Sequence, residues 1–330
     1  MKWIYRRILS MIITVFVTIN LTFFIVRLMP GNPLDVFVAQ QIAAGVPADQ
    51  AIRIASALFG VDLNKPLHEQ YIKYMSNLLR GNLGYSLTFL KTPVVQIIAK
   101  AIPWTLLVVG SATLLSFIVG IISGIFLAYK RGTKMESVTS LFAVILSGIP
   151  NYIIAILLLY YLGYAMKLFP TIGAYSAGME KAPLFEFIMD IIWHAALPVL
   201  SYFVTSFPFW MLITKGSTTS VLGEDYVAFA KLRGLNEKRI AITYVGRNAI
   251  LPPLTTLAIS LGAMFGGSVL VETLFSYPGM GYYLARSVNG RDYTLMQGIF
   301  LVITIAVVIS NTIADILYAL LDPRVRIVER

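Results

Sequence analysis

The chain has 330 residues, of which 58% are hydrophobic and only 13% are charged. About a quarter of the residues are charged in an ordinary soluble domain, so this composition excludes a soluble globular enzyme and a disordered chain. The formal net charge is +10. In a chain this apolar, basic residues set membrane orientation and contact anionic lipid rather than nucleic acid. With no cysteine and two histidines, the chain offers neither a disulfide framework nor a thiolate or histidine-rich metal site.

Six apolar runs approach or exceed the roughly 20 residues that a helix needs to cross a bilayer. They occupy residues 8–28, 104–128, 138–165, 191–213, 251–271 and 297–320. The first run follows basic residues as in a signal peptide, but it is too long for the apolar core of one, and we predict a retained span. The fourth contains Pro198 and Pro208, which a spanning helix tolerates when neighbours satisfy the freed carbonyls. The sequence therefore predicts an all-α polytopic membrane protein.

Lysine and arginine residues indicate how these six spans are oriented. The segments 1–7, 129–137, 214–250 and 321–330 fall on one side and together hold fifteen basic residues, whereas the short loops 166–190 and 272–296 on the other side hold four. Basic residues accumulate in cytoplasmic segments. We therefore expect both termini in the cytoplasm and the long segment 29–103 outside.

The outer segment 29–103 carries helical patterns of its own. In residues 48–59 one face is predicted to combine Ala51, Ile54, Ala55 and Leu58. In residues 66–80, which begin with a proline suited to a first helical turn, one face is predicted to combine Leu67, Tyr71, Tyr74 and Leu78. The turn signal Gly-Asn-Leu-Gly follows at 81–84. These elements predict a small helical domain over the outer face, too short for an independent enzyme domain.

Ionisable residues inside a span are functional candidates by default. Asp315 is the one in the C-terminal half of the sixth span, but proton relays are usually chains of several such groups, so a structural role near the cytoplasmic interface is favoured. Glu272, at the outer end of the fifth span, fits the lining of an entrance or a solvated helix end, and His194 fits an interfacial residue better than a ligand. The small-residue pairs Gly120–Gly124 and Gly262–Gly266 predict close helix approach.

The sequence carries no sign of catalysis. It shows no serine, histidine and aspartate at suggestive spacing and no cluster of metal ligands. A phosphate-binding G-x-x-x-x-G-K-[ST] motif is excluded because the chain contains no Gly-Lys dipeptide. We therefore expect a protein that is not an enzyme and binds no cofactor or metal itself, so that any ATP that drives it is bound by another subunit.

The cytoplasmic loop 214–250 is the most informative stretch, because a connection between two spans is usually short. Its sequence predicts two short helices separated by Gly234, with Asn236 capping the second. In the first helix Glu224 and Asp225 occupy the N-terminal turn, where the helix dipole favours negative charge. The apolar residues expected on one face of this helix are Leu222, Tyr226 and Phe229. Such a helix–glycine–helix shelf suits docking into a groove on a cytoplasmic partner.

These motifs resemble the permease subunits of ATP-binding-cassette (ABC) importers, and more narrowly the first-permease subfamily of the dipeptide/oligopeptide/nickel transport permeases. The cytoplasmic loop resembles the family's EAA loop at 224–227, at Ala230, Gly234 and Leu235, and at 247–252. Further motifs in the family's order lie at 27–33, 65–67, 79–84, 271–281, 291–293, 297–298 and 321–326. The general EAA pattern has Glu and Ala where this chain has Ala228 and Phe229, and its I-x-L-P ending falls later here, at 251–252.

The resemblance implies a transport function. Two homologous permeases would form one translocation path, an extracytoplasmic binding protein would deliver the substrate, and two separate ATPase subunits would bind ATP and Mg. The residues implied in coupling to an ATPase are Glu224, Asp225, Tyr226, Ala228, Phe229, Ala230, Gly234, Leu235 and Asn236. The candidates at the outer mouth of the path are Glu272, Tyr277, Asp292 and Tyr293. The implied location is a prokaryotic cell membrane, with lipid as a further partner.

Alternatives to this interpretation concern both the substrate and the protein class. Relatives of the resembled family carry di- and oligopeptides, nickel complexes or oligosaccharides, and we favour peptides, with a free metal ion least favoured because the path has few charges. An ion-coupled secondary transporter predicts repeat symmetry and midplane carboxylates, and a membrane-embedded enzyme needs a catalytic constellation. The sequence shows neither feature.

Overall fold

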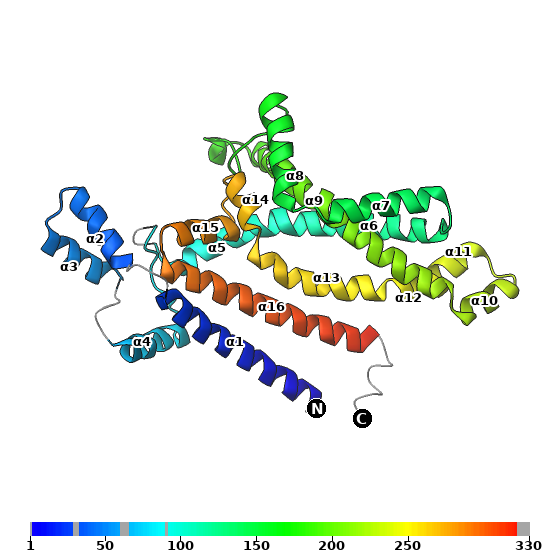
Figure 1. The fold of residues 1–330 in the computed structure, drawn as a ribbon, viewed down its shortest axis with the longest axis horizontal. Coiled ribbons are helices and arrows are strands. Elements are labelled where there is room, and N and C mark those ends of the chain that lie inside the picture. The colour runs from blue at the N-terminus through cyan, green and yellow to red at the C-terminus, as the bar shows by residue number, and fades with distance from the viewer. Residues whose placement is uncertain (1, 29–32, 60–65, 90–91, 322–330) are drawn as a thin grey trace.

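The computed structural model describes residues 2–28, 33–59, 66–89 and 92–321. Over these residues the chain is helical, and the only β pairing is an isolated bridge between Tyr85 and Pro93. The long helices that lie along one another are α1 (Lys2–Leu28), α6 (Ser111–Tyr129), α9 (Leu184–Leu222), α13 (Leu251–Ala263) and α16 (Tyr293–Leu321) (Figure 1). The all-α architecture expected from the sequence is confirmed.

The number of membrane spans agrees with the sequence, although one of them is broken. Five helices of the described chain are long and apolar enough to cross a membrane, and α7 (Lys134–Ser147) with Asn151–Ala165 makes a sixth span if this bent pair counts as one. The second half of the pair comprises α8 (Asn151–Leu158) and a π-helical stretch to Ala165. The two halves meet at 92°, because Pro150 disfavours helical backbone at the residue before it. This break lies within the span that the sequence predicted as continuous at 138–165.

Helix α9 continues beyond the expected fourth span, 191–213, at both ends. It begins after Pro183, ends before Gly223 and passes without interruption through Pro198 and Pro208. At 1.5 Å per residue, its 39 residues reach about 58 Å, nearly twice the roughly 30 Å of hydrocarbon in a bilayer. Its C-terminal turns therefore form the first part of the loop expected at 214–250.

The fifth span is interrupted near its outer end, where the sequence predicted helix to residue 271. Helix α13 passes into a 3-10 turn at Met264–Gly266, and α14 (Val269–Leu274) begins only after a break. At this break Gly267 has φ +63° and ψ −168°, a backbone conformation that essentially only glycine adopts. A Cβ atom on Gly267 would also lie 2.6 Å from Glu272 Oε1. Because Gly267 has no side chain, the backbone can turn here and pass close to the Glu272 carboxylate.

Close approach of helices is confirmed at three of the four glycines of the predicted pairs. Cβ atoms on Gly120 and Gly124 would overlap the backbone of α9, and the latter would lie 2.5 Å from Met211 O. A Cβ on Gly262 would lie 2.6 Å from Ser310 Cβ of α16, whereas one on Gly266 would meet only ordinary contacts. Gly120 and Gly124 therefore allow α6 to pack closely against α9, and Gly262 allows α13 to pack closely against α16.

Substituting Gly124 with leucine is expected to destabilise the chain by about 1–3 kcal/mol, the usual range for overpacking a tight contact. The side chain would collide with Met211 O and with Thr214 Cβ, which would be 2.7 Å from the added Cβ. Thermal unfolding of the purified protein in detergent measures this loss. Gly216→Leu is the matched control, because Gly216 lies on α9 with open space around it and leucine favours helix. Equal melting temperatures for the two variants would contradict the proposed packing.

In its described residues up to 89, the outer segment forms the helices α2 (Pro33–Ala43), α3 (Ala48–Phe59) and α4 (Leu67–Leu79). On the face predicted for α3, Ala51 and Ala55 are buried, whereas Ile54 is 39% exposed, and the side chain of Leu58 lies outside the described residues. The next helix, α5 (Val94–Thr105), begins before the expected domain boundary at 103 and continues through a π-helical stretch into α6. Residues of α5 pack with α15 (Met280–Asn289) and α16 in a cluster that contains Val94, Ile97, Ile98, Ala101, Met280, Leu295 and Ile299.

The helices place the two candidate regions at opposite ends of the molecule. In Figure 1, α15 lies in the half of the molecule that ends in α2 and α3, and α10 (Asp225–Leu232) and α11 (Glu237–Arg239) lie at the opposite end. The N-terminal end of α1 and the C-terminal end of α16 point toward the end that carries α10. Most of the motif at 27–33 and of the tail at 321–330 lies outside the described residues, as does the side chain of Asp315.

Candidate functional site

Helix α10 is held by an apolar face that points into its own loop. Val227 and Ala230 are buried and pack in a cluster with Ile240, Val245 and Ala249. These partners belong to the stretch from α11 through a π-helical segment to α12 (Arg247–Ala249), which leads directly into α13. Ala230, an expected ATPase contact, thus faces this cluster and not the surface.

The other side of α10 presents large apolar side chains to the surroundings. Phe229 is 64% exposed, Leu232 is 82% exposed and Tyr226 is 39% exposed. Ala228 is exposed beside them, whereas Leu222, expected on the same face, is half-buried against the inner cluster. Exposed apolar side chains gathered on one short helix at the end of the molecule are typical of an interaction surface.

The ends of α10 have the local structure that the sequence predicted. Glu224 stands at the N-cap with extended backbone, and Asp225 opens the first turn. At the other end Gly234 has φ +73°, and its N–H donates to Lys231 O at 2.9 Å. The Asn236 side chain then accepts a hydrogen bond from Lys238 N at 2.9 Å and caps the next helix. The left-handed stop and the asparagine cap are both confirmed.

Polar side chains tie the parts of the loop to one another and to α9. Asn248 Nδ2 donates to Tyr226 Oη at 2.9 Å, which joins α12 to α10. Ser217 Oγ of α9 donates to Ala249 O at 2.7 Å, which joins α9 to α12. The helix that carries the exposed face is therefore packed on a loop that is hydrogen-bonded to α9 and continues into α13.

Glu272 organises the outer hairpin, residues 267–292, from a fully buried position. Its carboxylate accepts hydrogen bonds from Thr105 Oγ1 at 3.0 Å, from Gly281 N at 2.8 Å and from Tyr282 N at 3.2 Å. Cβ atoms on Gly279 and Gly281 would overlap this core, so the two glycines let the hairpin close around the charge. Neither expectation for Glu272, an entrance lining or a solvated helix end, matches this buried position.

Asp292 is the second fully buried carboxylate of the outer hairpin. It accepts a hydrogen bond from Ser86 Oγ, one from Thr88 N at 2.9 Å and one from Leu295 N at 3.0 Å. The last of these caps the N-terminus of α16, where the helix dipole favours an anion. Asp292 thus fixes the segment after α4 to the start of α16.

The two tyrosines among the outer-mouth candidates are also buried. Tyr277 is fully buried, and its ring meets the ring of Trp104 edge to face at 5.8 Å between centroids. Tyr293 is 9% exposed and packs with Met296 at the start of α16. All four outer-mouth candidates therefore lie inside the chain's own packing in this conformation.

Two comparisons with known proteins identify the chain. Residues 120–327 match the family described as the binding-protein-dependent transport system inner membrane component. Residues 1–109 match the N-terminal family of the same membrane components. The chain belongs to this permease family. It is a multi-pass component of the inner membrane and a transport subunit of a binding-protein-dependent ABC importer.

Curated relatives align with the permease over nearly its whole length. The oligopeptide transport system permease protein AppB of Bacillus subtilis is 31% identical over 98% of both chains. The di/tripeptide transport system permease protein DppB of Pseudomonas aeruginosa is 30% identical over 99% of both. The nickel import system permease protein NikB of Staphylococcus aureus is 34% identical over 99% of this chain and 92% of its own. The resemblance found in the sequence is confirmed.

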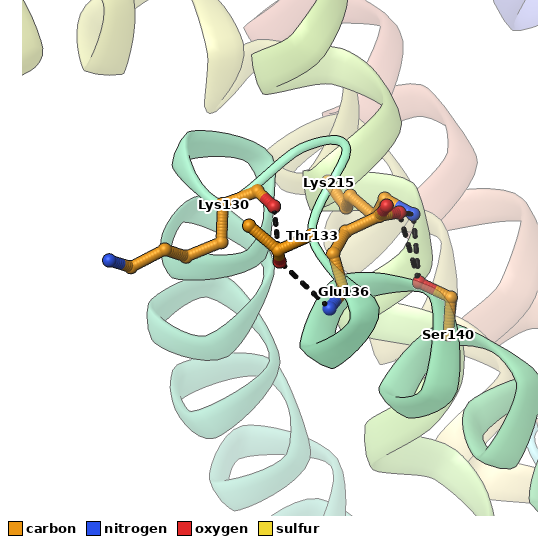
Figure 2. Close-up of polar contacts among 5 residues, drawn as sticks. All are labelled: Lys130, Thr133, Glu136, Ser140 and Lys215. Atoms are coloured by element: carbon orange, nitrogen blue, oxygen red, sulfur yellow. Dashed lines mark hydrogen bonds and ion pairs between the residues drawn. The ribbon is translucent and has the colours of Figure 1, made fainter.

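A polar contact that was not predicted from the sequence joins the bent third span of the permease to α9. Lys215 Nζ donates to Glu136 and, at 2.8 Å, to Ser140 Oγ, both on α7 (Figure 2). Thr133 is the N-cap of α7, and its side chain accepts a hydrogen bond from Glu136 N. From the sequence, Lys215 was only one of the basic residues that indicate the orientation of the chain. A contact between residues 79 positions apart leaves no pattern among neighbouring residues from which it could be predicted.

Replacing Lys215 with methionine is expected to lower the melting temperature of the permease. The change keeps the apolar stem but leaves the Glu136 carboxylate, 13% exposed, without its cation. In a double-mutant cycle with Glu136→Gln, the double variant should lose less than the sum of the two single losses. Thermal unfolding in detergent provides the three values, and strictly additive losses would show that the ion pair does not couple α7 to α9.

The described part of the permease does not assemble a metal site. No group of three or more histidine, aspartate or glutamate side chains is placed to hold a metal ion within those residues. His194 is buried on α9, and its Nδ1 lies 2.8 Å from Asp190 O one turn earlier. This polar contact of His194 thus comes from its own helix.

Proposed function

We propose that this permease pairs with a homologous second permease to import di- and oligopeptides delivered by an extracytoplasmic binding protein. The observation that carries the proposal is the exposed apolar face of α10, where Phe229 and Leu232 lie on a helix whose other face packs against its own loop. Relatives named as oligopeptide and di/tripeptide permeases support the choice of substrate. The nickel permease among the relatives makes a nickel complex the second candidate.

In this proposal α10 is the element on which an ATPase subunit acts. Two separate ATPase subunits bind ATP and Mg, and each accepts one permease's coupling helix in a surface groove. When the ATPases close, the force on Phe229 and Leu232 is passed on through the loop's inner cluster. Because that cluster is tied to α9 and leads into α13, both spans move with it. Among the other expected coupling residues, Gly234 and Asn236 form the turn and the cap that fix the direction of α10.

The proposed orientation places α10 and both chain termini in the cytoplasm. It is supported by the excess of basic residues in 1–7, 129–137, 214–250 and 321–330. The ends of α1 and α16 that carry the termini also point toward the α10 end of the molecule. The outer hairpin then faces the binding protein, with Glu272 and Asp292 setting its shape rather than touching the substrate.

Transport by the reconstituted complex tests this function. The complete importer in proteoliposomes should take up a labelled tripeptide when binding protein and ATP are both present, and excess unlabelled peptide should compete. A nickel complex and an oligosaccharide serve as alternative substrates in the same vesicles. Uptake that proceeds without any ATPase subunit, driven by an ion gradient, would contradict the proposal and support a secondary transporter.

A further inference from the structure

Helix α4 packs one face against the outer part of the first span. Tyr71 Oη donates to Asn20 Oδ1 of α1 at 2.8 Å. The Phe23 ring lies 5.2 Å from the Tyr71 ring and 5.3 Å from the Tyr74 ring, and Phe23 is fully buried as a result. The face that the sequence predicted on α4 is confirmed for its two tyrosines, whereas Leu67 is 57% exposed.

This contact lies at a depth where α1 is inside the bilayer. The apolar run of α1 continues to Val26, before Arg27, so Asn20 stands six residues before its outer end. At 1.5 Å per residue that is about 9 Å below the end of the run. Helices that lie in a membrane interface sit about 5–10 Å into the boundary between headgroups and acyl chains. Helix α4 meets α1 at that level.

A second face of α4 is apolar and uncovered. Ile72 is 64% exposed and Leu79 is 88% exposed, and Met75, which is half-buried, lies between them at helical spacing. Beside this face, α1 exposes Leu21 and Phe24, and the Phe24 ring stacks over the Tyr71 ring at 6.3 Å. The exposed apolar surface of α1 at membrane depth therefore continues onto α4.

A third face of α4 carries charge. Glu69 and Lys73 are exposed and stand one turn apart, on the side of the helix away from α1. A helix with apolar and charged faces suits a position between lipid and water. Large apolar side chains exposed to this extent are unfavourable in water, which leaves acyl chains as the environment that fits Ile72 and Leu79.

We propose that α4 is an interfacial helix whose Ile72–Leu79 face is inserted into the outer leaflet of the membrane. Lipid acyl chains cover this face, while Glu69 and Lys73 lie at the headgroup and water side. The helix thereby fixes the outer segment to the membrane beside α1. The proposal concerns the lipid contact of α4 and does not depend on which substrate the permease carries.

Spin labels provide a direct test, because the chain contains no cysteine. Single cysteines replace Glu69, Ile72, Lys73 or Leu79, and the labelled permease is assembled in the full importer complex in nanodiscs. Collision with oxygen reports lipid, and collision with a water-soluble nickel chelate reports water. Leu21→Cys on α1 provides the lipid reference, and Lys181→Cys on the exposed loop before α9 provides the water reference.

We expect labels at 72 and 79 to match the lipid reference and labels at 69 and 73 to approach the water reference. Nickel-chelate collision at 72 and 79 equal to that at 181 would overturn the proposal, because α4 would then stand in water. Immobile labels at 72 and 79 that neither reagent reaches would also overturn it, because the second permease or the binding protein would then cover the face. Elution of each labelled variant at the size-exclusion volume of the unlabelled wild-type complex shows that the complex is intact.

Discussion

Replacing Glu272 with alanine is expected to destabilise the permease by at least about 1–3 kcal/mol, the cost of leaving one buried hydrogen-bond donor without a partner. The change would strand Thr105 Oγ1 and the N–H groups of Gly281 and Tyr282, all of which now donate to the carboxylate. Because these donors come from α5 and from the hairpin itself, the outer hairpin would lose its anchor. Thermal unfolding and the yield of folded protein in detergent measure the loss.

Glu272→Gln is the informative companion of this variant. Glutamine keeps the shape and one acceptor oxygen, but its amide group is itself a donor and would face Gly281 N or Thr105 Oγ1. We therefore expect an intermediate loss of stability. If alanine at this position left the melting temperature unchanged, the carboxylate would not hold the hairpin. That result would favour a Glu272 side chain that lines an open outer mouth.

Replacing Phe229 with aspartate is expected to weaken the binding of the ATPase subunit by more than about 30-fold, or roughly 2 kcal/mol, the threshold for an aromatic hot spot. Phe229 is 64% exposed and is not part of the cluster that holds α10, so the isolated permease should keep its stability. A charge at this position would have to be buried against the partner. Affinity of the purified ATPase for the permease in detergent, together with peptide uptake in proteoliposomes, measures the effect.

Two variants distinguish a contact from a folding defect. Phe229→Leu preserves the apolar surface and should retain most of the affinity. Val227→Asp places a charge in the inner cluster, where Val227 is fully buried, and should lower the melting temperature as well as the affinity. Wild-type ATPase binding and uptake by Phe229→Asp would mean that the exposed face of α10 is not the docking surface.

Local features of the fold could be predicted because neighbours in the sequence determine them. The left-handed Gly234 and the cap at Asn236 follow from residue types at adjacent positions, and apolar runs of sufficient length give the spans. The close contacts of Gly120 and Gly124 follow from a four-residue spacing on one helix face. The break in the third span was missed because apolar composition on both sides of Pro150 masks it.

The outer hairpin could not be predicted, because its contacts join distant parts of the chain. Thr105 and Glu272 are 167 positions apart, and Ser86 and Asp292 are 206 apart. A carboxylate at the end of an apolar run has the same local pattern whether it faces water, lines a path or is buried among backbone N–H groups. For α10 the helix was predictable, but which side packs inward was not, because Val227 and Ala230 are as apolar as the residues that stay exposed.

Coupled measurement of uptake and ATP hydrolysis with Gly234→Pro in this chain tests the central claim most directly. Gly234 has φ +73° and its N–H donates to Lys231 O. Proline fixes φ near −65° and has no N–H, so the turn that aims α10 would be lost while the spans remain. Gly132→Pro is the matched control, because Gly132 has φ +82° in an open turn between α6 and α7. If α10 transmits ATPase closure, peptide-stimulated hydrolysis and uptake fall together in Gly234→Pro while the complex still assembles and the control stays active. Uptake at the wild-type rate with Gly234→Pro would show that the loop only tethers the ATPase.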